Sequence, residues 1–116
     1  MKKSPVIYLN HILDCLNRIR EYTNGIGKDE FLQNKLVQDA VIRNFEIIGE
    51  ATKHLDVEFR NKYHHIEWRK IAGMRDKLIH DYLGVDLWAV WAVVEEIVPG
   101  LEDEITDIIE KENPSN

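Results

Sequence analysis

The 116-residue sequence has few of the residues that interrupt helices or cross-link chains. It contains three prolines and six glycines, and no stretch alternates apolar and polar residues as a half-buried strand does. Its one cysteine, Cys15, cannot form a disulfide within the chain, which is typical of a reducing compartment. The longest apolar run, eight residues from Leu87 to Val94, is far shorter than the ~20 residues that span a bilayer. We therefore expect a cytoplasmic protein with no β-sheet, no disulfide and no contact with a membrane.

Acidic and basic side chains are unevenly distributed along the chain. The formal net charge of −6 argues against broad, non-specific binding of nucleic acid. Residues 60–80, however, hold six basic and two acidic side chains, a net charge of +4, together with His64, His65 and His80. Residues 81–116 have a net charge of −9. The basic segment is either a solvated helix face or a narrow anion site, and charge alone leaves both interpretations open.

Apolar residues recur every three or four positions through most of the chain, which predicts an all-α bundle. We expect three long helices and one short helix, over about residues 5–24, 29–55, 68–79 and 87–112. A polar loop is expected around Arg60 to His65. Pro99 removes one backbone hydrogen bond inside the last helix, so we expect it to kink that helix rather than end it. The length suits a single domain over residues 1–116.

Two predicted helices have more apolar surface than one buried stripe requires. Trp88, Ala89, Ala92 and Val93 flank the main stripe of the last helix, and Phe45 lies off the stripe of the second helix. A bundle of this size cannot cover every face of each helix. We therefore predict that some of this surface contacts another chain, with a homodimer as the simplest arrangement.

Some polar residues occupy positions where the pattern calls for apolar ones. Asn44 lies on the apolar stripe of the second helix, and Arg75 lies among the inward positions of the third. A guanidinium there needs an ion pair or a polar cleft. A pair with Glu46 or Glu50 that buttresses the bundle is one interpretation, and a functional site is the other. His80, five residues after Arg75, is suited to capping the helix end.

Taken together, these residues resemble a known family. The segment from Trp68 to Tyr82 contains Arg75-x4-His80-x-Tyr82 and resembles the signature of the HEPN superfamily, in its HepT-like toxin branch. The run Arg43-Asn44-Phe45-Glu46-Ile47-Ile48-Gly49-Glu50-Ala51 resembles the second-helix segment of that branch, and Gly84-Val85-Asp86 followed by Trp91 and Pro99 also fits. An Arg-x4-His pair alone is a weak signal. The extended block and its second-helix partner are a strong one, and the resemblance covers nearly the whole chain.

The resemblance implies a homodimeric, metal-independent endoribonuclease, the toxin of a toxin–antitoxin pair whose antitoxin is a minimal nucleotidyltransferase of the MntA type. Arg75 and His80 of two subunits would meet in a cleft at the dimer interface as the catalytic residues, with no metal or other cofactor. Tyr82 would carry the hydroxyl that the antitoxin adenylylates to silence the toxin. Three residues of the second helix, Asn44, Glu46 and Glu50, are candidates to orient Arg75 or line the cleft.

The residue types suit RNA cleavage without a metal. That reaction needs a base for the 2′-hydroxyl, an acid for the 5′-oxygen and a cation for the phosphorane. Histidine titrates near neutrality, and the planar fork of arginine matches two phosphate oxygens. The family often has asparagine after the arginine, whereas this sequence has Asp76. A carboxylate beside the arginine is expected to weaken RNA binding.

Other interpretations of the sequence remain. The chain would serve equally as a non-catalytic helical partner that presents substrate to a minimal nucleotidyltransferase, in which case Arg75 and His80 cleave nothing. His64-His65 with Glu67 is a weak metal-site pattern, because adjacent histidines point apart. Cys15 follows His11 by one helical turn but lies beside the apolar stripe, so we expect a small core residue rather than a Cys–His pair.

Overall fold

A computed structural model of the chain describes residues 4–80 and 85–113, with side chains described for 4–76 and 85–113. Within these residues the regular structure is helical throughout, which confirms the all-α prediction. The helices are α1 (Pro5–Thr23), α2 (Lys28–Gln33), α3 (Lys35–Lys53), α4 (Val57–Lys62), α5 (Trp68–His80), α6 (Leu87–Glu96) and α7 (Val98–Glu112).

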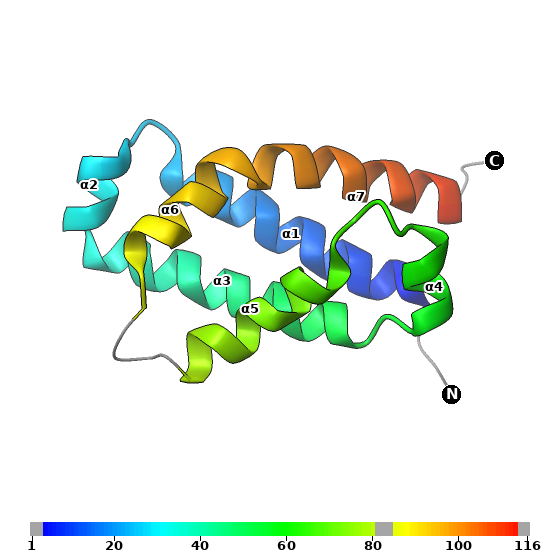
Figure 1. Cartoon of the computed structure of the whole chain (residues 1–116). Coiled ribbons are helices and arrows are strands. Elements are labelled where there is room, and N and C mark those ends of the chain that lie inside the picture. Colours follow the sequence, from blue (N-terminus) through cyan, green and yellow to red (C-terminus); the bar gives the residue numbers. More distant parts are fainter. Residues whose placement is uncertain (1–3, 81–84, 114–116) are drawn as a thin grey trace.

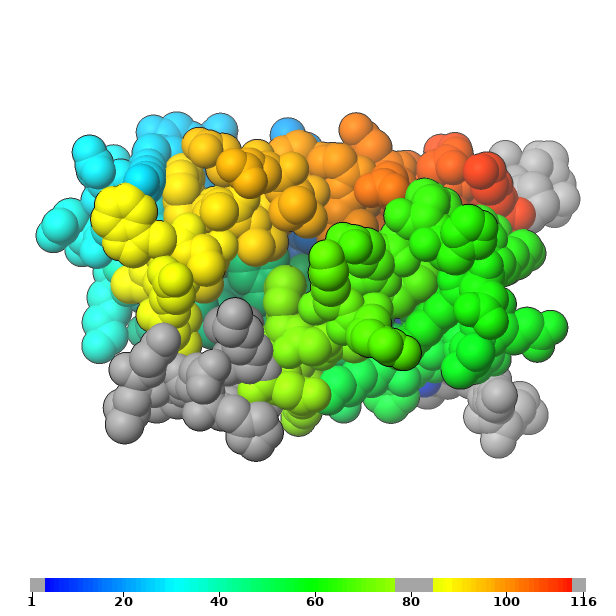
Figure 2. Space-filling view, in the orientation of Figure 1, coloured from blue at the N-terminus to red at the C-terminus, as the bar shows by residue number. Residues whose placement is uncertain are grey.

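α1, α3 and α7 run along the length of the molecule, with α1 antiparallel to the other two, and α5 crosses α3 obliquely (Figure 1). α3 packs against α1 on one side and α5 on the other, and α1 also packs against α7. The short helices α2 and α6 lie at one end of the molecule and α4 lies at the other. The space-filling view shows α4 to α7 in front, with part of α3 visible between α5 and α6 (Figure 2). α3 is therefore the helix around which the bundle is built.

Polar side chains set the start of most helices. Ser4, Asn34, Asp56 and Asp86 each accept a hydrogen bond from a backbone N–H in the first turn that follows. Such a bond satisfies a donor that has no partner within the helix. The helix starts predicted near residues 5 and 87 are confirmed, because the capping signals that set them are local in the sequence.

The prediction of one helix of about 26 residues after Asp29 is wrong. The chain is extended at Asn34 (φ −108°, ψ 93°), so α2 ends there and α3 begins. The Asn34 side chain accepts a hydrogen bond from the backbone N–H of Val37 at 3.1 Å, an alternative to continuing the helix that short polar side chains favour. Phe31 is fully buried on the far side of this break, so the apolar spacing continues across it.

Two smaller boundaries also differ from the sequence expectation. α4, capped by Asp56, occupies the start of the segment expected to be a polar loop. Pro99 falls in the first turn of α7, because the helix ends at Glu96 and restarts at Val98. A proline in that position loses no intrahelical hydrogen bond, so the chain breaks where we expected a kink. The described residues thus form seven helical segments, instead of the three long helices and one short helix that were predicted.

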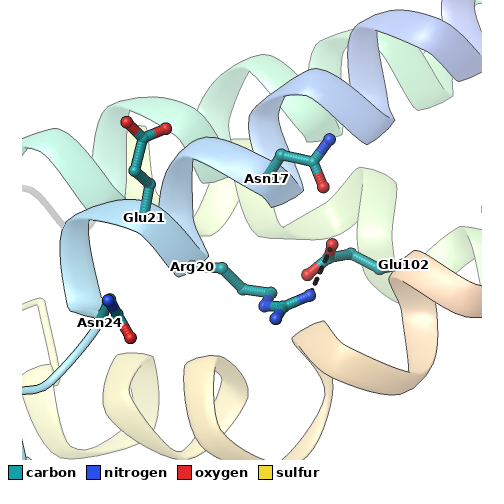
Figure 3. A pocket seen from close by; sticks show the side chains of 5 residues that line it. All are labelled: Asn17, Arg20, Glu21, Asn24 and Glu102. Atoms are coloured by element: carbon teal, nitrogen blue, oxygen red, sulfur yellow. Dashed lines mark hydrogen bonds and ion pairs between the residues drawn. The ribbon is translucent and has the colours of Figure 1, made fainter.

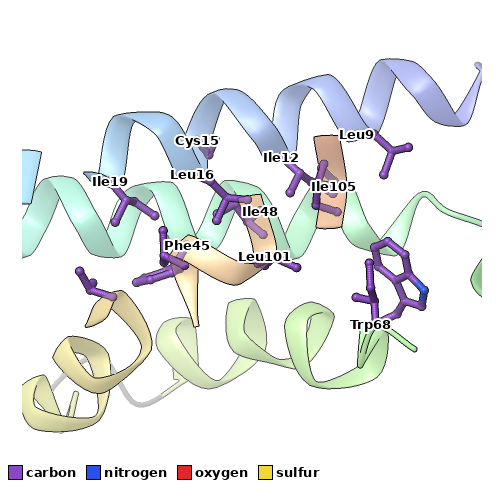
Figure 4. Close-up of a cluster of buried hydrophobic side chains, with 14 of the residues drawn as sticks. Leu9, Ile12, Cys15, Leu16, Ile19, Phe45, Ile48, Trp68, Leu101 and Ile105 are labelled. Atoms are coloured by element: carbon purple, nitrogen blue, oxygen red, sulfur yellow. The ribbon is translucent and has the colours of Figure 1, made fainter. Parts of the chain in front are cut away.

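The helices bury one continuous apolar cluster, part of which Figure 4 shows. Cys15 lies within it at 1 % exposure, and burial raises the pKa of its thiol, as expected of a core residue. Phe45 is also buried, at 3 % exposure, so the prediction that it offers surface to another chain is wrong. The reason is that α3 is packed on two sides and uses more than one face within its own chain.

Some apolar side chains remain on the surface. Trp88 is 60 % exposed, with the Lys28 ammonium 3.6 Å from its ring centroid, and Leu36 and Ile97 are also exposed. Within the described ranges, 4–80 and 85–113, no helix is long and apolar enough to cross a membrane. The exposed tryptophan matches the predicted surplus on the last helix.

Candidate functional site

The site begins where α3 and α5 cross. A Cβ atom placed on Gly49 of α3 would lie 2.7 Å from the Cβ of Arg75 and 3.0 Å from the Arg75 backbone nitrogen. Real Cβ atoms do not approach so closely, so only glycine permits this separation of the two helices. Gly49 therefore decides where Arg75 stands relative to α3.

The Arg75 side chain is held by a carboxylate one residue further along α3. Its Nε atom lies 2.6 Å from Oε2 of Glu50, and its side chain is 35 % exposed. The predicted pair of Arg75 with Glu46 or Glu50 is thus made with Glu50. A second contact joins Nη1 of Arg75 to Oδ1 of Asp76 at 3.4 Å, and the Lys53 ammonium lies 2.7 Å from the same Asp76 oxygen. Lys53 offsets the charge of the carboxylate that stands beside the arginine.

Arg75 lies at the edge of an open hollow of about 380 Å³ between α1, α3 and α5. Five residues of α3 and its C-cap, His54, lie three or four positions apart along one face and line it together with two residues of α1. The lining residues are Tyr8, His11, Arg43, Glu46, Ile47, Glu50, Ala51, His54 and Arg75. Three of the predicted site residues, Glu46, Glu50 and Arg75, therefore come together here.

Two rings close one side of this hollow. Tyr8 of α1 and His54, the C-cap of α3, stack with ring centroids 4.9 Å apart and planes inclined by 9°. Nε2 of His54 also lies 3.8 Å from Oε1 of Glu50, so Glu50 stands between His54 and Arg75. Sequence reasoning missed both rings. The spacing of Glu50 and His54 on one face of α3 was a signal for His54, but nothing in the sequence linked Tyr8 to it.

The remaining predicted residues lie elsewhere or are not described. Asn44 is buried at 6 % exposure, and its side-chain nitrogen donates a hydrogen bond to the Ala40 carbonyl at 2.8 Å. The amide of Asn44 thus has its hydrogen-bond partner within α3, and Asn44 is not among the residues that line the hollow. His80 ends α5, but its side chain is outside the described residues, and Tyr82 lies outside them altogether.

The weak metal-site pattern finds no support in the part of the chain that the structure describes. His64 and His65 are both exposed, and Nε2 of His65 lies 3.8 Å from a single carboxylate, Glu104. No group of three or more potential ligands comes together among the described residues.

A second hollow, of about 330 Å³, lies between α1 and α7 (Figure 3). Arg20 reaches across it, with Nη1 3.2 Å from Oε2 of Glu102. Glu102 is 7 % exposed, and its other carboxylate oxygen is buried without a hydrogen-bond partner among the described residues. Arg20 is largely exposed, and we assign this pair to the docking of α7 on α1.

The end of α7 is tied to α4 by a further polar contact. Glu112 accepts hydrogen bonds from the Lys62 ammonium, at 2.7 Å, and from the Tyr63 hydroxyl. These two bonds lower the pKa of Glu112, and the bond to Glu112 raises the pKa of Tyr63. This cluster lies outside the hollow beside Arg75 and anchors α4 on α7.

Comparison with known proteins places this arrangement in a family. The model of the family described as "Ribonuclease HepT-like" matches residues 12–108, which include α3, α5 and seven of the nine residues that line the hollow. The chain belongs to the HepT-like ribonuclease family. The resemblance drawn from the sequence is thereby confirmed.

Several proteins are similar to this HepT-like chain over most of its length. A "Probable ribonuclease HepT" of Thermococcus cleftensis is 45 % identical over 102 residues, which cover 88 % of this chain and 93 % of that protein. A "Putative RNase" of Caldanaerobacter subterraneus subsp. tengcongensis is 42 % identical over 95 % of this chain and 98 % of its own length.

A longer relative comes from Methanocaldococcus jannaschii. It is named "Gamma-glutamylcyclotransferase and putative RNase" and is 52 % identical over 96 % of this chain. The HepT-like chain spans half of the length of that protein. No solved structure matches the chain.

Proposed function

We propose that this HepT-like protein is a metal-independent endoribonuclease in which Arg75 and His80 cleave RNA at the interface of a homodimer. The observation that carries the proposal is the position of Arg75, held by Glu50 at 2.6 Å at the edge of an open polar hollow. Membership of a ribonuclease family and relatives named as ribonucleases support the choice of RNA as substrate.

Arg75 is placed to stabilise the phosphorane. Glu50 holds its Nε atom, which fixes the plane of the guanidinium. Among the described residues the terminal nitrogens have only the 3.4 Å contact with Asp76, so they remain able to donate to phosphate oxygens. The charge that develops on those oxygens as the 2′-oxygen attacks is then met by a cation already in place.

Histidine supplies the proton transfers in this mechanism. One His80 takes the proton from the attacking 2′-hydroxyl, and a second His80 gives a proton to the leaving 5′-oxygen. One subunit has a single His80, so a two-fold axis that brings two copies together provides both groups. The exposed apolar surface that includes Trp88 supports association of two chains.

The sequence Arg75-x4-His80-x-Tyr82 supports a wider role for this protein. In this proposal the ribonuclease is the toxin of a toxin–antitoxin pair in the cytoplasm. Its antitoxin is an MntA-type nucleotidyltransferase, which transfers AMP from ATP to the Tyr82 hydroxyl and releases pyrophosphate. The mass of the protein co-expressed with such a partner should increase by AMP units, and the increase should be absent in Tyr82→Phe.

Cleavage of RNA by the purified protein in EDTA tests the proposal. We expect products that end in a 2′,3′-cyclic phosphate, with activity lost in Arg75→Ala and in His80→Ala. Arg69→Ala is the matched control, because Arg69 is an exposed arginine on the same helix outside the hollow. Full activity of His80→Ala would refute the mechanism. A protein that binds the nucleotidyltransferase but cleaves no RNA would instead be its non-catalytic partner.

A further inference from the structure

The hollow beside Arg75 is larger than contact with one phosphate requires. At about 380 Å³ it is within the ~300–1,000 Å³ range of small-molecule sites. It extends from Arg75 along α3 to Arg43 and His54, and across to His11 on α1. The volume leaves room for more of a substrate than the reacting phosphodiester. Arg43, His11 and His54 are potential hydrogen-bond donors to that part of the substrate.

Arg43 and His11 give the hollow two side chains that can bind an anion. Arg43 and His11 are both exposed and come from different helices, so their side chains reach the hollow from two sides. The carboxylates that line it are Glu46 and Glu50, and the second of these is engaged by Arg75. An arginine and a histidine at the rim are groups that bind phosphate oxygens.

The stacked rings favour an unpaired base. His54 stacks on Tyr8 in a nearly parallel arrangement, and its side chain is still 53 % exposed. Single-stranded RNA is recognised largely by stacking of unpaired bases on tyrosine and histidine rings. The Tyr8–His54 pair therefore offers a ring platform beside a site with phosphate-binding groups.

We propose that this hollow binds the unpaired nucleotide next to the cleaved phosphodiester. The base stacks on the Tyr8–His54 pair, and Arg43 and His11 contact the adjoining phosphate. This inference rests on the proposed ribonuclease function and adds the class of substrate, single-stranded RNA, and the residues that select it. The site predicts a ribonuclease that discriminates against duplex RNA.

Binding of uncleavable RNA tests the inference. The probe is a fluorescent 2′-O-methyl oligonucleotide, which lacks the nucleophilic 2′-hydroxyl, used as a single strand and as a duplex. Stacking on one aromatic residue changes affinity by about 5- to 150-fold. Because His54 is half exposed, we expect His54→Ala to weaken single-strand binding by about five- to tenfold and duplex binding hardly at all. His54→Phe, which keeps an aromatic ring, should restore most of the affinity.

His65→Ala is the matched control. Its side chain has the same 53 % exposure as His54 and the same 3.8 Å distance to a carboxylate, but it lies outside the hollow. We expect its affinity to equal that of the unmodified protein. In the unmodified protein, the NMR signals of His11 and His54 should shift on addition of the single strand, while those of His65 should not.

The outcomes separate this inference from the proposed function. If the protein cleaves RNA but His54→Ala binds the single strand as tightly as before, the nucleotide site is refuted and the ribonuclease stands. Equal weakening for single strand and duplex would refute the base platform. A protein that neither cleaves nor binds RNA would refute both proposals.

Discussion

Replacement of Gly49 by alanine tests how the helix crossing positions Arg75. The new Cβ would lie 2.7 Å from the Arg75 Cβ, whereas ordinary contact begins at 3.4 Å. The helices must therefore separate by roughly 1 Å to restore a normal carbon–carbon distance. Overpacking of this kind costs about 1–3 kcal/mol, and the higher helix propensity of alanine offsets about 0.5–1 kcal/mol of it.

From the middle of each range, we expect Gly49→Ala to lose about 1 kcal/mol in the free energy of unfolding. For a domain of this size that lowers the Tm by roughly 4–8 °C, measured by circular dichroism. The same displacement moves Arg75 relative to any RNA bound in the cleft. Since a misplacement of about 1 Å can cost up to ~100-fold in rate, we expect RNA cleavage to fall by more than the loss of stability alone explains.

Gly73→Ala is the control for this prediction. Gly73 lies on α5 two residues before Arg75, and a Cβ there would have nothing within 4 Å. It should therefore stabilise the protein by about 0.5–1 kcal/mol, through helix propensity alone, and leave cleavage unchanged. If Gly49→Ala proves as stable and as active as Gly73→Ala, the close crossing does not position Arg75 and the reasoning is wrong.

Two further predictions concern charge. Asp76→Asn removes a carboxylate 3.4 Å from Arg75. We expect the RNA probe to bind about threefold more tightly, which is the effect of removing one negative charge roughly 7 Å from a phosphate in water. Equal or weaker binding would contradict this prediction. The lowered pKa of Glu112 contributes stability at pH values above its usual 4.5, which is lost as the pH falls through the lowered value. Denaturant unfolding measured between about pH 3 and 6 should show this loss of stability. In Glu112→Gln the free energy of unfolding should depend less on pH over the same range.

The local parts of the fold could be predicted because their causes are local. Ser4 and Asp86 cap the helices that follow them, and one residue and its near neighbours decide that contact. The break at Asn34 was missed because apolar spacing runs through it, from the buried Phe31 before the break to the buried Val41 after it. Phe45 was misassigned because periodicity reports one buried face, whereas α3 is packed on two sides.

The candidate site divides in the same way. The type and spacing of Arg75, His80 and Tyr82 are properties of the sequence, and together with the extended block around them and the second-helix segment they were sufficient to identify the family. The partner of Arg75 was narrowed to two glutamates, because residues one turn apart on a helix present nearly the same face. Only the crossing of α3 and α5 selected Glu50.

By itself, the sequence determined an all-helical chain of the HepT-like family with a basic segment inside an acidic protein. The tertiary structure decided which side chains share one space. It stacked Tyr8 of α1 on His54 at the C-terminal end of α3 and placed Arg75 of α5 in the same hollow. These residues are far apart in the sequence, and their meeting depends on how closely three helices pack. Gly49 controls part of that packing through the side chain it lacks.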